Sequence, residues 1–381
     1  MLGLLGLTAT RIGLSSIPAY LLAGLLLGPN EPKALSLVRP SEVTHFVADL
    51  GIVFLLFFLG LEFTLGRLAR TRNHVLVGGG IDLAINAGLG LAIGFAAFRF
   101  SFAALIVAAA VYISSSAITV KGLIEFKRLA DDETDLVLAI LVGEDLVIAF
   151  VLGFAAGGGA TLGQTLTIAG KALGFIVLSL AASSWLRRPI DRLLTRLPRE
   201  FFLLAVFAFL TGMAATARAL DLSEAIGALM AGVVLSETSA REEIEERFFS
   251  FRDVFAALFF FVFGLSIDVA SMGDVAWILI AATVVALAGK TVGGYTAGLL
   301  GGLNRRQSFN AGVALIAHGE FTIIIAQLAS ANTAIARGDR LELVAFAGLY
   351  VLVTATIGLA LMKQSKALGR RGFALPSAER S

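Results

Sequence analysis

Long apolar stretches separated by short polar or Gly/Pro-containing segments recur along the whole chain. A helix needs roughly 20 mainly apolar residues to cross a bilayer, and most of these stretches approach that length. The pattern therefore predicts an all-α polytopic membrane protein with about thirteen transmembrane helices. The expected spans cover residues 2–14, 16–29, 46–63, 75–97, 101–120, 136–156, 165–186, 201–219, 222–236, 251–268, 275–302, 307–331 and 341–362.

Positive charge alternates between successive loops. Loops after odd-numbered spans hold 21 of the 30 Lys and Arg residues, and loops after even-numbered spans hold six. A single missed or invented span midway would destroy this alternation. Because Lys and Arg are enriched in cytoplasmic loops, we expect the N-terminus outside and the C-terminus in the cytoplasm. Residues 363–381 then form a short cytoplasmic tail.

Composition supports the membrane interpretation and excludes several functions. The chain is 57% hydrophobic and only 15% charged, whereas soluble domains average about 25% charged residues. The net charge of +2 and the lack of a basic stripe exclude a nucleic-acid partner. With no cysteine and three histidines, a transition-metal site is not expected. Neither a phosphate-binding glycine loop nor an HExxH motif is present, so we expect no enzyme activity and no cofactor.

An internal repeat relates the two halves of the chain. Residues 13–28 align without gaps on 221–236, and residues 49–66 align on 253–270. The second span then corresponds to the ninth and the third to the tenth, which is an odd offset. The halves must therefore have opposite topologies, an arrangement typical of secondary transporters with a midplane site. We expect one membrane domain over 1–362, with a first repeat at about 13–156 and a second at about 221–362.

Polar residues interrupt the fifth and twelfth spans at corresponding places. The residues concerned are Ser114, Ser115, Ser116 and Thr119 in the fifth span and His318 and Glu320 in the twelfth. Such interruptions are typical of the discontinuous helices of secondary transporters. Unwound backbone is tolerated at this depth only where it is buried or lines a cavity. For the serines alone, the alternative is a hydrogen bond to the preceding helical turn.

Three charged residues near the middle of spans are the strongest functional candidates: Glu144, Asp145 and Lys290. A charge at the bilayer centre costs roughly 2.5–3.5 kcal/mol. The adjacent acids point about 100° apart on a helix, and like charges this close oppose simultaneous ionisation. Such a group binds a cation or a proton in competition. Lys290 is expected to pair with these carboxylates, and the alternative for it is a static ion pair.

Other polar residues within the spans have two interpretations each. Asp82 and Asn86 lie about one turn apart in the fourth span, so they either line an ion path or form only interhelical hydrogen bonds. Glu320 and His318 are expected to balance the positive ends of broken helices. For His318 the alternative is a pH sensor.

Several stretches together resemble the cation:proton antiporter-2 family of bacterial sodium/proton and Kef-type potassium/proton exchangers. They occur in family order and cover nearly the whole chain. The matching stretches are IPAYLLAGLLLGP, GIVFLLFFLGLEF, YISSSAITVKGL, the Glu-Asp pair in VGEDL, LFFFVFGLSID, LAGKTVGGY and AHGEFTIIIAQ.

The resemblance implies a homodimer in the bacterial inner membrane, with dimerisation and core bundles interleaved along each chain. Its acidic pair falls on Glu144 and Asp145, and its core lysine falls on Lys290. These three residues are the predicted ion- and proton-binding site, with Asp145 as the ligand of the alkali cation. The crossing of broken helices falls on 114–119 and 318–320.

This sequence also departs from the family pattern. Its sodium exchangers usually have two aspartates and its Kef-type members have Gln-Asp, whereas this chain has Glu-Asp. The choice between Na⁺ and K⁺ therefore stays open. Many potassium-linked members carry a cytoplasmic nucleotide-binding regulatory domain, and the sequence ends soon after the last predicted span. We expect regulation to be absent, supplied by a separate subunit, or located in a missing domain.

Together these features predict a secondary active transporter that exchanges K⁺ or Na⁺ for H⁺ by alternating access. Two other functions fit the same architecture. The first is a cation channel, which would carry flux without proton coupling. The second is a sodium-coupled symporter of an organic anion, which would require an organic substrate.

Overall fold

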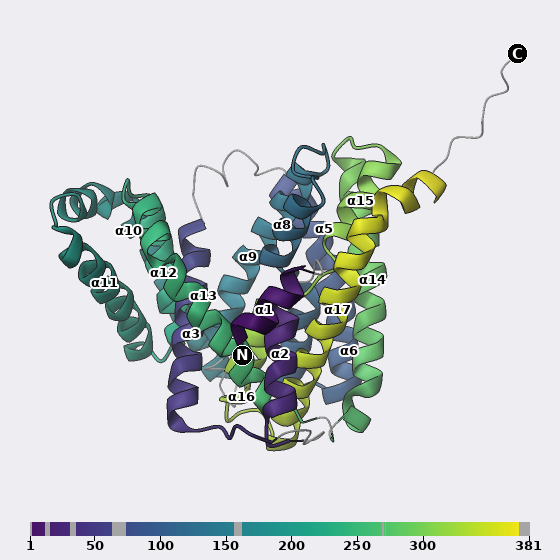
Figure 1. Cartoon of the computed structure of the whole chain (residues 1–381), viewed down its shortest axis with the longest axis horizontal. Coiled ribbons are helices and arrows are strands. Elements are labelled where there is room, and N and C mark those ends of the chain that lie inside the picture. The colour runs from purple at the N-terminus through teal and green to yellow at the C-terminus, as the bar shows by residue number, and fades with distance from the viewer. Residues whose placement is uncertain are drawn as a thin grey trace, which may run out of the picture.

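A computed structural model describes residues 2–11, 16–30, 36–62, 74–155, 162–268, 270 and 272–372, and its regular structure is helical throughout these ranges (Figure 1). In chain order the elements are α1 (Leu2–Arg11), α2 (Ser16–Leu27), α3 (Glu42–Glu62), η1 (Val75–Gly79), α5 (Gly80–Asp82), η2 (Leu83–Ala87), α6 (Gly88–Phe98), α7 (Phe102–Tyr112), α8 (Ser116–Glu125), α9 (Thr134–Ala155), α10 (Leu162–Leu194), α11 (Arg199–Ala219), α12 (Glu224–Ser236), α13 (Arg241–Ser266), α14 (Met272–Leu300), α15 (Arg305–Ala314), α16 (Glu320–Ser330) and α17 (Arg337–Gly372). The elements η1 and η2 are π-helical.

The prediction of an all-α membrane protein is confirmed. Within the described residues, seven helical segments are long and apolar enough to cross a bilayer, and three shorter helices are also apolar. Each predicted span overlaps at least one of the helices above. The count of thirteen crossings stays a prediction. Helix α17 continues to Gly372, and the last residues of the predicted tail lie outside the described ranges.

The helices form two bundles. The first bundle contains α1 to α3 and α10 to α13, and the second contains η1 to α9 and α14 to α17. In Figure 1 α10 and α11 lie at the left edge, whereas α14 and α17 lie at the right. Contacts between the bundles come mainly from α9 against α10 and α12, and from α17 against α2 and α13. Each bundle is thus assembled from both halves of the chain.

Two close helix crossings in the first bundle are built on pairs of glycines. The backbones of Gly24 and Gly264 meet between α2 and α13, and those of Gly60 and Gly232 meet between α3 and α12. The sequence alignment pairs Gly24 with Gly232 and Gly60 with Gly264. Exchanging the two halves therefore converts one crossing into the other, as the predicted repeat requires. The repeat itself stays a prediction.

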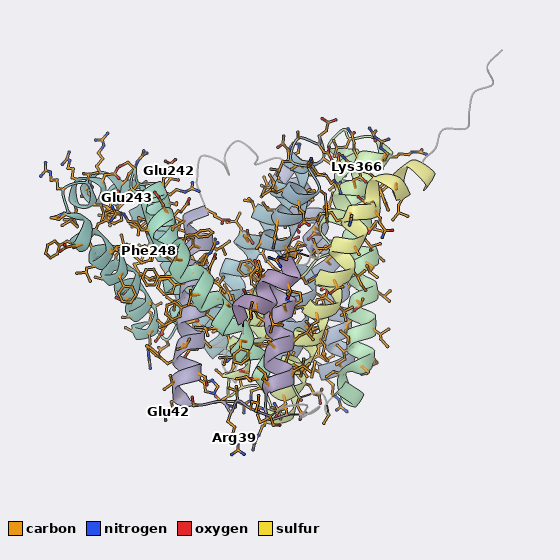
Figure 2. The ribbon with its side chains drawn as sticks, viewed as in Figure 1. Arg39, Glu42, Glu242, Glu243, Phe248 and Lys366 are labelled. Carbon is orange, nitrogen blue, oxygen red and sulfur yellow. The ribbon has the colours of Figure 1, made fainter. Side chains whose placement is uncertain are left out.

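The two classes of loop lie at opposite ends of the molecule. Figure 2 shows Arg39 and Glu42 at the lower end and Glu242, Glu243 and Lys366 at the upper end. Arg39 belongs to a loop predicted to face outside, and Lys366 follows the last predicted span. The charges are therefore segregated along the direction in which the long helices run.

Candidate functional site

Two interrupted helical segments meet inside the second bundle. Backbone between α7 and α8 is not helical at residues 113–115, and backbone between α15 and α16 is not helical after Leu315. Ser115 N–H donates to Ala317 O (2.8 Å), so the two interruptions bond directly to each other. Such groups must be satisfied internally because lipid offers no hydrogen bonds. Ser116 and Thr119, predicted to belong to the interruption, lie in the first turn of α8 instead.

Side chains from elsewhere satisfy the last carbonyl groups of α7, which a helix end leaves without intrahelical partners. Thr322 Oγ1 donates to Ala110 O (3.1 Å). The ring nitrogen Nε2 of His318 lies 2.9 Å from Val111 O, and the Lys290 ammonium donates to Tyr112 O.

The facing carbonyl groups at the end of α15 are satisfied in the same way. Ser114 Oγ donates to Leu315 O (2.8 Å) and Thr119 Oγ1 donates to Ala314 O (3.1 Å). Each interruption thus supplies donors to the other.

Glu320 lies where α8 and α16 begin. Its carboxylate accepts from Ser115 Oγ (2.7 Å) and from the backbone N–H groups of Ala117 and of Glu320 itself. A helix N-terminus carries a partial positive charge, so a carboxylate there is favourable. This contact agrees with the charge-balancing role predicted for Glu320. The ring of His318 instead contacts carbonyl groups and the Tyr350 hydroxyl (3.0 Å).

Glu144 and Lys290 form a fully buried ion pair. Lys290 Nζ donates to Glu144 Oε1 (2.8 Å), and both side chains are 0% exposed. Glu144 Oε2 also accepts from the backbone N–H of Ser114. Ser114 Oγ lies 2.9 Å from Glu144 Oε1 and 2.8 Å from Leu315 O, and its single hydrogen serves one acceptor at a time. The hydroxyl can therefore donate to a Glu144 carboxylate or accept from its protonated form.

A second carboxylate contacts the same lysine. Asp82 Oδ2 accepts from Lys290 Nζ (2.8 Å), and Asp82 is also fully buried. The sequence interpretation paired Lys290 with Glu144 and Asp145 and missed this contact. The available signal was that Asp82 lies within an apolar span, where an ionised group needs a partner. Asn86 Nδ2 donates to Asp82 Oδ1 (2.8 Å), so the predicted Asp82–Asn86 pair does share one face.

Asp145 is bonded far more sparsely than Glu144. It is 7% exposed, and among the described residues one group donates to it, the Ser116 hydroxyl, at 3.3 Å to Oδ1 and 3.2 Å to Oδ2. The charged groups that act on it most are all acidic, namely Glu144, Glu62 and Glu320. A buried carboxylate without a cationic partner is a site that attracts a proton or a metal cation.

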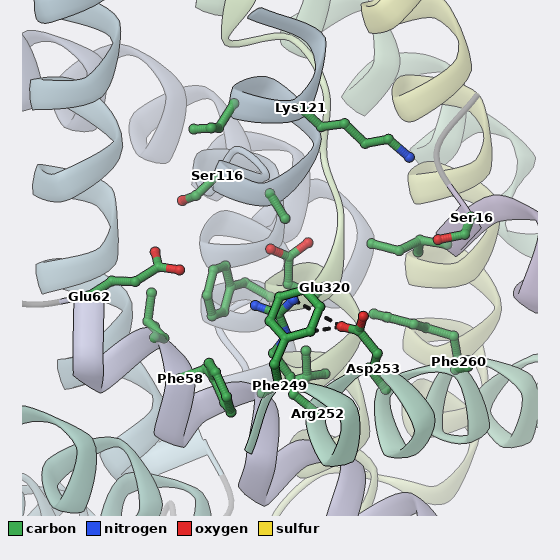
Figure 3. A pocket seen from close by; sticks show the side chains of 18 of the residues that line it. Ser16, Phe58, Glu62, Ser116, Lys121, Phe249, Arg252, Asp253, Phe260 and Glu320 are labelled. Carbon is green, nitrogen blue, oxygen red and sulfur yellow. Dashed lines mark hydrogen bonds and ion pairs between the residues drawn. The ribbon is translucent and has the colours of Figure 1, made fainter. Parts of the chain in front are cut away.

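A cavity of about 860 Å³ reaches this carboxylate's hydroxyl partner, Ser116 (Figure 3). One wall comes from α2, α3 and α13 of the first bundle, and the other comes from α8 and α16 of the second. Figure 3 shows Glu62, Arg252 and Lys121 around the cavity, with Glu320 near its centre. The cavity therefore lies between the bundles and reaches Ser116, whose hydroxyl contacts Asp145.

Comparisons with known proteins agree with this architecture. A sequence model of the family described as "Sodium/hydrogen exchanger, transmembrane" matches residues 1–363. The chain is 39% identical over 371 residues to the K(+)/H(+) antiporter subunit KhtU of Bacillus subtilis, covering 95% of this chain and 90% of that protein. It is 30% identical over 378 residues to the ammonium/H(+) antiporter subunit AmhT of Alkalihalophilus pseudofirmus, covering 98% and 93%.

A solved structure also resembles the fold. The sodium proton antiporter MjNhaP1 from Methanocaldococcus jannaschii, at pH 8, matches with a TM-score of 0.72. The match covers 96% of this chain and 95% of that chain, at 15% sequence identity. At this identity the likeness concerns the fold alone.

Proposed function

Since the chain belongs to the transmembrane sodium/hydrogen exchanger family, we propose that it exchanges a monovalent cation for protons at Asp145. One observation carries the assignment of the residue. Asp145 is a buried carboxylate with hydrogen bonds from a single hydroxyl, and it lies beside a cavity between two helical bundles. Glu144, its neighbour, is already occupied by Lys290 and Ser114.

Competition at one carboxylate is sufficient for antiport. A cation on Asp145 excludes a proton, and a proton removes the negative charge that binds the cation. In this state Lys290 pairs with Glu144 and keeps the neighbouring acid out of the competition; during the cycle the lysine releases and reclaims Glu144. We assign Asp145 as the cation ligand, with cavity water and the Ser116 hydroxyl as further ligands.

The position of the cavity between the bundles supports alternating access. Its walls belong to different bundles, so sliding one bundle against the other would close this entrance and open another on the opposite end. Lys121 and Arg252 line the cavity and belong to the Lys/Arg-rich loops after odd-numbered spans, or to the flanks of these loops. By the positive-inside rule these loops face the cytoplasm, so the present entrance of the cavity faces the cytoplasm. The proposal also places the protein in the inner membrane of a bacterium, as a homodimer with its N-terminus outside.

The transported cation is K⁺ or Na⁺, and K⁺ is the first to test. The relative that is 39% identical is named as a K(+)/H(+) antiporter, and the one that is 30% identical is named for ammonium. Both names include the word subunit. We therefore include a separate cytoplasmic regulatory subunit in the proposal.

The test is K⁺- or Na⁺-driven proton flux in proteoliposomes that enclose a pH-sensitive dye. Wild type is expected to move protons only when a cation gradient is present, and Asp145→Asn is expected to abolish this flux because the amide carries no charge. Wild-type flux in Asp145→Asn would overturn the assignment. Cation flux without proton movement would indicate a channel, and a requirement for an organic anion would indicate a symporter.

A further inference from the structure

Lys290 has a complete set of hydrogen-bond acceptors, and the exchange mechanism above uses only one of them. An ammonium has three N–H donors. Those of Lys290 go to Glu144 Oε1, Asp82 Oδ2 and Tyr112 O. None of these four residues lines the cavity. Asp82 is therefore a buried charge whose place in the exchange is still unassigned.

The local fold holds Asp82 firmly against the lysine. The π-helical elements η1 and η2 flank the single turn α5 that ends at Asp82, and π-helical turns inside helices are frequently found at functional sites. On α14, the facing positions are glycines. A Cβ atom on Gly289 would lie 2.3 Å from Asn86 Oδ1, and one on Gly293 would lie 3.5 Å from Asp82 Oδ1. The glycine at 289 therefore permits the close approach that brings Asp82 to Lys290.

We propose that Asp82 is a positioning residue of the exchange cycle, which stays bound to Lys290 and keeps the lysine charged and in place while Glu144 leaves and returns. This rests on the proposed exchange function. A neutral amine has two donors and a lone pair, and the lone pair would face an acceptor oxygen in this arrangement. With Asp82 and Tyr112 O in place, the ammonium keeps two acceptors and a counterion even without Glu144.

Without Asp82, Glu144 would be the sole counterion of Lys290. Departure of Glu144 would then strand a buried ammonium, which is strongly unfavourable. The other ionisable groups facing the lysine do not replace Asp82. Tyr112 presents its ring face (5.2 Å to the centroid), and the ring of His318 contacts the carbonyl oxygens of Ile316 and Val111 and the Tyr350 hydroxyl. The neighbouring elements η1, η2 and α6 contain no ionisable residue.

The experiment measures the pH profile of K⁺-driven proton flux in proteoliposomes for wild type, Asp82→Asn and Asp82→Glu. Asp82→Asn is expected to lower turnover without changing the K⁺ concentration for half-maximal rate, because Asp145 is untouched. Its loss of activity at alkaline pH is expected to begin about one pH unit or more below that of wild type. Asp82→Glu is expected to restore the wild-type profile.

Thr283→Val is the matched control. Thr283 also lies on α14, and its hydroxyl has no hydrogen-bond partner in the described part of the chain. An Asp82→Asn profile that parallels those of wild type and Thr283→Val would overturn the proposal, even if the rate is lower. So would an Asp82→Glu profile that stays like Asp82→Asn.

Two further measurements keep the outcome decisive. If Asp82→Asn does not fold, the thermal stability of Asp82→Glu, which keeps a second carboxylate for Lys290, is measured beside it. Recovery of stability in Asp82→Glu supports the proposal, whereas equal loss in both variants contradicts it. Failure of the exchange function itself is recognised separately, because wild type would then show no cation-dependent proton flux at any pH.

Discussion

Replacing Gly60 with alanine is expected to force α3 and α12 apart. A Cβ atom at this position would lie 2.1 Å from Leu229 O and 2.8 Å from the Cα of Gly232. Unbonded heavy atoms are most favourable at about 3.5 Å or more, so the helices would have to separate by about 1 Å. Both opposing atoms belong to backbone, and neither can rotate away. Overpacking of this kind costs about 1–3 kcal/mol, and the upper end is expected here.

The assay is thermal unfolding in detergent, followed by intrinsic fluorescence. Gly212→Ala on α11 is the matched control, because nothing lies within 4 Å of an added Cβ there. That substitution is expected to be neutral or to stabilise by about 0.4–1 kcal/mol. The double variant Gly60→Ala/Gly232→Ala is expected to lose less than the sum of its single variants, because both disturb one crossing. A Gly60→Ala protein as stable as Gly212→Ala would refute the reasoning.

Three further predictions concern other polar contacts. Ser116→Ala removes the hydroxyl that donates to Asp145, and we expect the half-saturating K⁺ concentration to rise about tenfold with turnover retained; an unchanged K⁺ titration would contradict this. Arg128→Met leaves the buried carboxylate of Glu133 without its positively charged partner. Thermal unfolding should therefore show that the free energy of unfolding falls by about 3–5 kcal/mol. The exposed Lys171–Asp221 pair is different. The hydrogen bond from Lys171 lowers the pKa of Asp221. Any stability that the pair contributes is therefore present at neutral pH and lost on acidification. Lys171→Met should abolish that pH dependence of stability without measurable unfolding at pH 7.

The hydrophobic pattern was sufficient for the fold class but not for the local geometry of its helices. Thirteen apolar stretches predicted helices, and each overlaps at least one. The π-helical turns around Asp82 left no trace in the pattern, because an apolar span offers no polar face from which to read a period. Because the spans are uniformly apolar, the pattern also did not show where the helices break. The polar residues Ser114 and His318 pointed to the breaks, whereas the non-helical backbone begins at the apolar Ile113 and Ile316.

The sequence predicted only part of how the buried charges pair. The free-energy cost of placing a charge in the membrane was enough to identify Lys290, Glu144 and Asp145, because each lies deep in an apolar span. Burying the charge of Asp82 has the same cost, but its partner, Lys290, is 208 residues away in the sequence. Which carboxylate reaches the lysine depends on how α5 and α9 pack against α14 and α7. Adjacency in sequence offered both Glu144 and Asp145 to the lysine, whereas in the structure packing leaves it Glu144 and adds Asp82.

The division between Glu144 and Asp145 follows from their positions on one helix. Adjacent helical residues point about 100° apart, so only one of the two acids can face the lysine. Glu144 takes that side and accepts from Lys290 and from Ser114. Asp145 is left toward α8 with one hydroxyl as its partner. A carboxylate whose oxygens are already filled by donors must break bonds before it can bind a substrate, whereas a sparsely bonded one needs only to lose its water or proton. In this state Asp145, and not Glu144, is therefore the acid with free capacity for a cation or a proton.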